Sequence, residues 1–359
     1  MKKTTAALVA LGLVVAGWGD DGGTTKAGAA PASTTTTEPP VTPSGALGGY
    51  QPVSDVGQHA KMSADVCDIN ALLDARPIDF TAIGVIYRDG RHSTEANGSK
   101  RTLGKFAREP RSTEDLLGRY ERHLGAGWLD AFASAALGGT SAFAGEPDLV
   151  RRQGVQKGAR DQVLVAWAFH ELDAAVDKAT KNNFANATGA PHNWDEARAY
   201  YYGEKPECTP YATAEERGRE FGTGSAVNER ILAAMHQGLK ALLAKDATGA
   251  AKARDEVVRN ITITYIQSAI KYSTEIDAAL AQGKTDDARV WQAEGWAYFR
   301  VIEPLVAGVN TGAARDVTGV FDLEAKPAQG SGEKVASALA RAYEALKIRP
   351  SEVGQYHVS

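Results

Sequence analysis

The sequence predicts an all-α protein: a single large helical domain built around a duplicated helical hairpin, preceded by a signal segment and a disordered stalk. Long stretches repeat apolar residues at three- and four-residue spacing, while the alternation of β-branched residues typical of strands is scarce. Alanine, the strongest helix former, is abundant. With 43% hydrophobic residues in 359, the chain can bury a substantial core.

Residues 1–18 have the pattern of an export signal. Lys2 and Lys3 precede an apolar run at 6–16, which is too short for an ordinary membrane-spanning helix. The segment LVVAGW resembles a bacterial lipoprotein signal, with Trp18 at the position of the lipid-bearing cysteine. Because tryptophan has no thiol to form the thioether, lipid anchoring is not expected. The sequence therefore predicts an exported protein of the periplasm or cell surface.

Residues 19–57 are rich in Gly, Thr, Ala and Pro, a composition that buries little and predicts a disordered stalk. The folded domain is expected over 58–359. Its first part should hold shorter helices, at 68–75, 78–88, 99–108, 113–123 and 127–136. Longer helices should follow at 161–179, 225–246, 253–283 and 284–308, with a closing helix at 332–347. Pro304 should kink or end the helix that contains it.

An internal repeat links two of these regions. The segment 170–203 recurs as 274–301, with Glu171 matching Glu275, Glu196 matching Glu294 and Tyr200 matching Tyr298. The simplest account is a duplicated helical hairpin about a pseudo-twofold axis. Residues 165–180 should then lie near 262–282, and 193–203 near 288–301.

The repeated helices also carry the candidate metal ligands. His192, Glu196 and Tyr200 are spaced i, i+4, i+8 and share one helix face, as Glu294 and Tyr298 do in the second copy. Around a common axis, the two copies would form one site with ligands His192, Glu196, Tyr200, Glu294, Tyr298, Glu171 and Glu275. Carboxylates, phenolates and one imidazole are hard donors that suit Fe(III). The alternative is a core tyrosine stripe with solvated or paired carboxylates.

Weaker candidates lie elsewhere. Tyr87 and Arg88 precede the helix-stop Gly90 and could bind an anion, or could simply form a capped helix end. The basic segment 151–162 could line an anion site, although such a run is usually a solvated face. His170, next to Glu171, could be a ligand or merely a polar residue at the edge of the core. Four other histidines belong to no constellation: His59, His123, His236 and His357.

The chain has two cysteines, Cys67 and Cys208. In an oxidising compartment they should form one disulfide; the alternative is two separate buried thiols. The net charge of −4 argues against nucleic acid as a partner. The sequence contains no P-loop, Rossmann fingerprint or nucleophile elbow, so we do not expect an enzyme of those classes.

Four separated motifs together resemble the Fea1 family, the low-iron-inducible periplasmic proteins of algae related to phytotransferrins. They lie at 78–93, 150–179, 190–224 and 291–304, and the resemblance runs from about Asp65 to Lys347. It implies extracytoplasmic capture of Fe(III), with carbonate as a synergistic anion. A membrane iron transporter or receptor would then be the partner.

Two other functions stay open. A carboxylate-bridged metalloenzyme would use four glutamates of duplicated helices, but its Glu-x-x-His signature is absent from both copies. A helical scaffold domain at the cell surface would bind no metal.

Overall fold

The described part of the chain is helical, as the sequence predicts. The computed structural model describes residues 49–111 and 115–357, so the predicted signal segment and most of the predicted stalk lie outside the described residues. No β-strand occurs in these ranges, apart from an isolated bridge between Thr94 and Lys100. The first helices are α1 (Gly57–Ala60), α2 (Met62–Asp74), α3 (Phe80–Asp89), α4 (Leu103–Arg108), α5 (Leu116–Leu124), α6 (Trp128–Gly138) and the 3₁₀ turn η2 (Ser141–Phe143).

The rest of the chain contains the longest helices. They are α7 (Asp148–Lys157), the π-helical turn η3 (Gly158–Val163), α8 (Leu164–Thr180), α9 (Ala190–Tyr202), η4 (Pro206–Cys208), α10 (Pro210–Glu220), α11 (Ala226–Leu243) and α12 (Ala247–Ala281). The chain continues through α13 (Thr285–Phe299), α14 (Glu303–Val309), α15 (Thr311–Phe321), α16 (Ser331–Ala340) and α17 (Pro350–Val353). Pro304 stands in the first turn of α14, so the predicted helix 284–308 is divided as expected. None of the described helices is long and apolar enough to cross a membrane.

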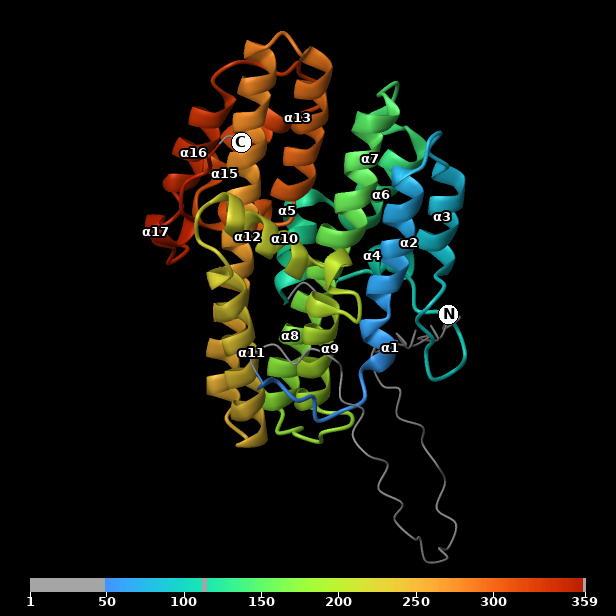
Figure 1. The fold of residues 1–359 in the computed structure, drawn as a ribbon. Coiled ribbons are helices and arrows are strands. Elements are labelled where there is room, and N and C mark those ends of the chain that lie inside the picture. The colour runs from blue at the N-terminus through green and yellow to red at the C-terminus, as the bar shows by residue number, and fades with distance from the viewer. Residues whose placement is uncertain (1–48, 112–114, 358–359) are drawn as a thin grey trace, which may run out of the picture. The chain divides into compact units, whose positions relative to one another are not determined.

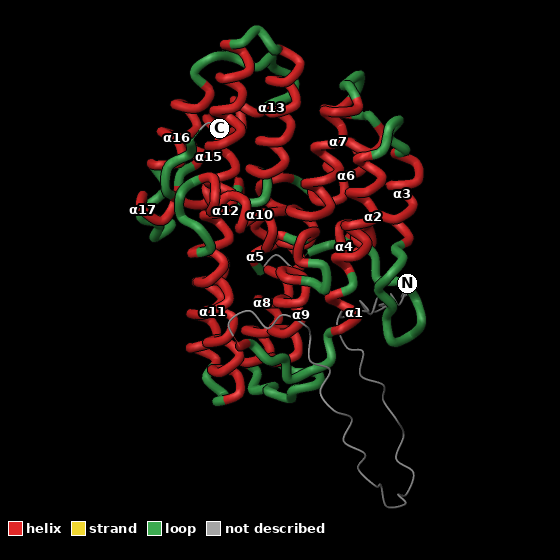
Figure 2. Tube along the Cα trace, in the orientation of Figure 1, coloured by secondary structure: helices red, strands yellow, loops and turns green. Residues whose placement is uncertain are grey.

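Two hairpins form the centre of the fold (Figures 1 and 2). In the first, α7, η3 and α8 follow one another without a break, and α9 folds back against α8. In the second, α12 is followed by α13, which packs against it. The α8 helix also packs against α12, so the first helices of the two hairpins meet.

The second helices of the two hairpins have different neighbours. α9 packs against α8, α11 and α1, whereas α13 packs against α12, α7 and α15. Figure 1 places α9 in the lower part of the view and α13 in the upper part. The main contacts therefore differ from the prediction, which paired 193–203 with 288–301. Other helices pack against the faces of α9 and α13 that were expected to meet.

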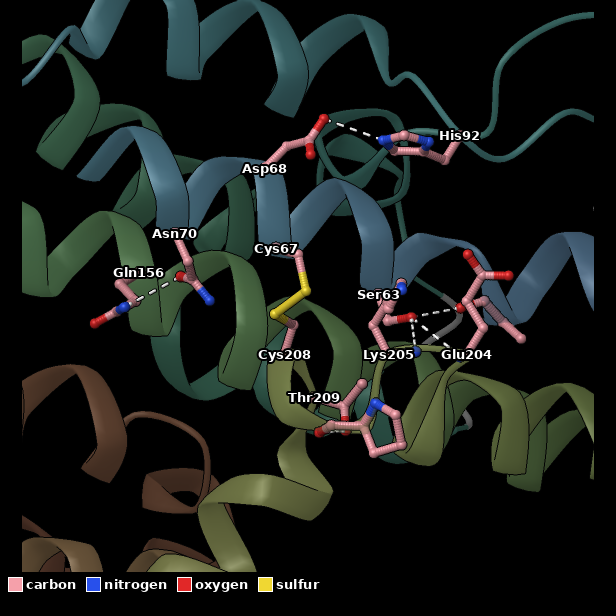
Figure 3. Close-up of a disulfide and its surroundings, with 12 residues drawn as sticks. Ser63, Cys67, Asp68, Asn70, His92, Gln156, Glu204, Lys205, Cys208 and Thr209 are labelled. Atoms are coloured by element: carbon pink, nitrogen blue, oxygen red, sulfur yellow. Dashed lines mark hydrogen bonds and ion pairs between the residues drawn. A yellow bond between two sulfur atoms is a disulfide. The ribbon is translucent and has the colours of Figure 1, made fainter. Parts of the chain in front are cut away.

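A disulfide joins Cys67 of α2 to Cys208 of η4, which confirms the predicted pairing (Figure 3). The two Cα atoms lie 5.4 Å apart and are separated by 141 residues in sequence. Ser63 Oγ, one turn earlier on α2, accepts the backbone N–H groups of Glu204 and Lys205 at 3.1 and 3.0 Å. The bridge and these hydrogen bonds fix α2 to the segment that follows α9.

Replacing both cysteines by serine should lower the free energy of unfolding by about 2–4 kcal/mol, because the bridge restricts a long stretch of the unfolded chain. Urea denaturation followed by circular dichroism measures the difference. Wild-type protein treated with reductant should lose a similar amount. Equal stability of the serine variant and the oxidised wild type would contradict a structural role for the bridge.

Candidate metal site

The α9 helix is oriented by its tryptophan. Trp194 is fully buried and its indole Nε1 donates a hydrogen bond to the Met235 carbonyl of α11 at 2.7 Å. The ring lies over Gly238, where a Cβ atom would stand 1.8 Å from Trp194 Cζ2. Because Trp194 faces α11, the face that carries His192, Glu196 and Tyr200 is directed elsewhere, toward α1 and α8.

Glu196 stands between two imidazoles. Its Oε1 atom lies 2.9 Å from His59 Nε2 and 3.0 Å from His192 Nε2. His192 is one turn earlier on α9, as the sequence predicts, but His59 comes from the short helix α1 at the start of the described domain. All three side chains are largely shielded from solvent, and that of Glu196 is 11% exposed.

A second carboxyl group completes the cluster. Asn193 Nδ2 donates to Glu171 Oε2 at 2.6 Å and to Glu196 Oε2 at 3.2 Å, so the amide bridges the two glutamates. Burial, followed by the charge of Glu196, raises the pKa of Glu171 well above its usual value. Burial has the same tendency at Glu196, but the hydrogen bonds from His192 and His59 outweigh it and hold the pKa of Glu196 low. Burial therefore favours the protonated form of Glu171, whereas the hydrogen bonds from the two imidazoles favour the ionised form of Glu196.

Several buried atoms of this cluster have no hydrogen-bond partner among the described residues: Nδ1 of His59, Nδ1 of His192 and Oδ1 of Asn193. Leaving such an atom unsatisfied costs about 1–3 kcal/mol. In the described residues, no three or more His, Cys, Asp or Glu side chains are arranged to hold a metal ion. The Nε2 atoms of His59 and His192 are instead each in contact with Glu196 Oε1.

Tyr200 lies beside the cluster. Its ring stacks on Trp167 of α8, with centroids 4.3 Å apart, and meets the edge of His59 at 5.8 Å. Burial raises the pKa of the phenol well above 10, while the positive charge of Arg101 acts in the opposite direction. The predicted ligands His192, Glu196, Tyr200 and Glu171 are therefore neighbours, joined by His59.

The predicted ligands of the second copy lie in a different cluster. Glu294 Oε1 forms an ion pair with Lys157 Nζ of α7 at 2.8 Å, and Tyr298 OH accepts a hydrogen bond from Arg160 Nη2 at 2.8 Å. Glu275 accepts a hydrogen bond from Tyr356 near the C-terminal end. The structure thus does not bring these residues to Glu196, because α7 packs on α13 where the symmetric prediction placed α9.

The anion candidates Tyr87 and Arg88 lie on α3, away from both clusters. Tyr87 is buried and donates its hydroxyl hydrogen to Asp130 Oδ1 at 3.2 Å. Burial, followed by the charge of Asp130, raises the pKa of Tyr87 well above 10. Arg88 is exposed, and it lines a surface hollow together with Arg151 and Phe80.

The model of the family Fea1, described as low iron-inducible periplasmic protein, matches residues 24–359. The chain belongs to the Fea1 family. No curated protein and no solved structure matches it. Membership in this low-iron-induced, periplasmic family connects the chain with iron and with the space outside the cytoplasm.

Sequence reasoning missed His59, which is central to the cluster of this Fea1 chain. His59 is 137 positions from Glu196 in sequence and stands on a four-residue helix, so no periodic pattern connects the two. The available signal was the presence of a histidine directly at the start of the predicted domain.

Proposed function

We propose that this Fea1-family chain captures ferric iron outside the cytoplasm and that His59, Glu171, His192, Glu196 and Tyr200 are its ligands. The observation that carries the proposal is the buried Glu196 carboxylate between two imidazoles, with a second carboxyl group bridged to it by Asn193.

The chemistry of the donor set fits a ferric ion. Two carboxylates and a phenolate are hard anionic ligands, and imidazole is a common nitrogen ligand for iron. Iron would replace the hydrogen bonds that now join these side chains, and would compensate the charges that burial disfavours.

Binding would also displace protons. At His192, burial opposes the charged imidazole, but the hydrogen bond and charge of Glu196 together outweigh it and raise the pKa. The pKa values of Glu171 and Tyr200 are raised as well, so the protonated form of each group is favoured over its charged form. Because each must lose its proton to bind the metal, ferric binding would weaken as the pH falls.

A synergistic carbonate is part of the proposal, and Arg101 is its best candidate anchor. The Arg101 side chain is buried, donates to Ser93 Oγ at 3.3 Å and lies near enough to Tyr200 to influence the phenol's pKa. A guanidinium group presents parallel N–H donors that match a planar oxyanion. Arg88, by contrast, is an exposed residue of α3 and lies away from the Glu171–Glu196 cluster. A membrane iron transporter or receptor would take over the captured ion.

One observation favours a second candidate function. The buried Glu171 and Glu196 pair with two nearby histidines resembles the donor composition of carboxylate-bridged metal centres in helical proteins. Such an enzyme would consume oxygen when supplied with ferrous iron, whereas a ferric carrier would not.

The proposed tyrosinate ligand predicts different behaviour for two equivalent tyrosines. Wild-type protein titrated with ferric citrate in bicarbonate should bind iron and develop the visible tyrosinate-to-iron absorption band. The Tyr200→Phe variant should lose the band and bind more weakly, because it lacks the phenolate. Tyr298→Phe, the matched change in the other hairpin, should keep both properties, because Tyr298 is hydrogen-bonded to Arg160. A band that survives Tyr200→Phe, or a wild type that binds no iron, would refute the assignment.

A further inference from the structure

Glu294 of α13 is the counterpart of Glu196 of α9, but different groups surround it. Glu196 Oε1 contacts two imidazole nitrogens, whereas Glu294 Oε1 contacts the ammonium group of Lys157 at 2.8 Å. Equivalent glutamates of the two hairpins thus have different neighbours. Glu196 faces two imidazoles that can bind a metal ion, and Glu294 faces the charged side chain of a lysine.

Lys157 is held in a cradle of oxygen atoms. Besides Glu294, its Nζ donates to Gln153 Oε1 at 2.7 Å and to Gln156 Oε1 at 2.6 Å. An ammonium group has three N–H donors, and all three are used here. The residue is 4% exposed, so these oxygens rather than water solvate the charge.

The neighbouring buried charges are also paired. Arg160 Nε lies 3.0 Å from Asp161 Oδ2, and Arg217 lies within 2.9 Å of both Glu216 and Glu220. Arg217 Nη1 also donates a hydrogen bond to the hydroxyl oxygen of Tyr272 at 3.2 Å. This cluster therefore carries its own cations, the side chains of Lys157, Arg160 and Arg217.

We propose that the Lys157 ammonium is the resident cation of the second hairpin, at the place where the first hairpin takes its metal ion, so that the chain holds one metal ion. Shortening Lys157 then opens a second site for a hard cation, lined by oxygens of Glu294, Gln153 and Gln156. The count of one ion rests on the proposed function, whereas the oxygen site depends on the contacts of Lys157 alone.

The test uses Mn(II), which prefers oxygen ligands and whose free form is counted by electron paramagnetic resonance. The parent is the full chain with Glu196→Gln, which removes the carboxylate of the first cluster. Adding Lys157→Ala should let the chain bind one Mn(II) ion more than this parent. Lys157→Met should bind no extra ion, because an apolar side chain of similar length fills the cradle.

A second substitution, Lys157→Gln, keeps a polar group in the cradle and adds one more oxygen. Binding of one extra ion by the alanine or glutamine variant, or folding that depends on Mn(II), supports the proposal. The proposal is overturned if neither Lys157→Ala nor Lys157→Gln binds an extra ion, or if neither variant folds even with Mn(II). It is also overturned if Lys157→Met binds an extra ion. A failure of the proposed function would be seen separately: wild type and the Glu196→Gln parent would then bind ferric iron with equal affinity.

Discussion

Replacing Glu196 by glutamine is expected to lower ferric affinity at least about 100-fold, since changes to groups that merely orient metal ligands already reduce affinity 10–100-fold. Glu196 contacts both His59 and His192, and Asn193 bridges it to Glu171. The amide of glutamine has nearly the same shape as the carboxylate but carries no negative charge. The loss should therefore appear in metal binding while the helical content is unchanged, measured by competition with a ferric chelator and by circular dichroism.

The matched control is Glu303→Gln. Glu303 is also a buried glutamate beside a histidine, with its Oε1 atom 3.3 Å from His123 Nε2, but it lies on α14. Its substitution should leave ferric affinity within the error of the measurement. Full affinity in Glu196→Gln, or an equal loss in both variants, would place the ferric site elsewhere.

Periodicity was sufficient to predict the long helices of the two hairpins and one face of the candidate site. Apolar spacing predicts the long helices of both hairpins, and the i, i+4, i+8 spacing places His192, Glu196 and Tyr200 on one face, where the structure has them. Such a pattern concerns one helix at a time. It does not determine which helix packs against that face, and for this reason His59 of α1 was missed and the Glu294 and Tyr298 pair was assigned to the wrong neighbours.

The basic segment 151–162 shows a second limit. A charge run of this kind predicts a solvated face, but the structure buries Asp161 within η3 and Lys157 directly before it. The π-helical turn η3 adds a residue to the turn and shifts the side chains that follow it around the helix axis. Sequence periodicity cannot reveal that shift, because it assumes a constant number of residues per turn.

Replacing Asp161 by alanine should destabilise the fold by about 3–5 kcal/mol, the loss typical of breaking a buried ion pair from one side. Asp161 has no solvent exposure, and its Oδ1 accepts hydrogen bonds from Thr213 at 2.7 Å and Tyr265 at 3.0 Å. Its Oδ2 atom accepts the Nε hydrogen of Arg160 at 3.0 Å, and the guanidinium group is itself nearly buried. The substitution leaves this cation and two hydroxyl groups without their acceptor.

The measurement is the urea midpoint of wild type, Asp161→Ala and the double variant Asp161→Ala/Arg160→Met. Because the methionine removes the unpaired charge, the double variant should recover part of the lost stability, which a pure loss of packing would not allow. Asp255→Ala is the control: this aspartate pairs with Arg254 but its side chain is 70% exposed, so the loss should stay below about 1 kcal/mol. Similar losses in Asp161→Ala and Asp255→Ala would show that the charges around η3 are solvated, and the resident-cation cluster of the second hairpin would then lose its physical basis.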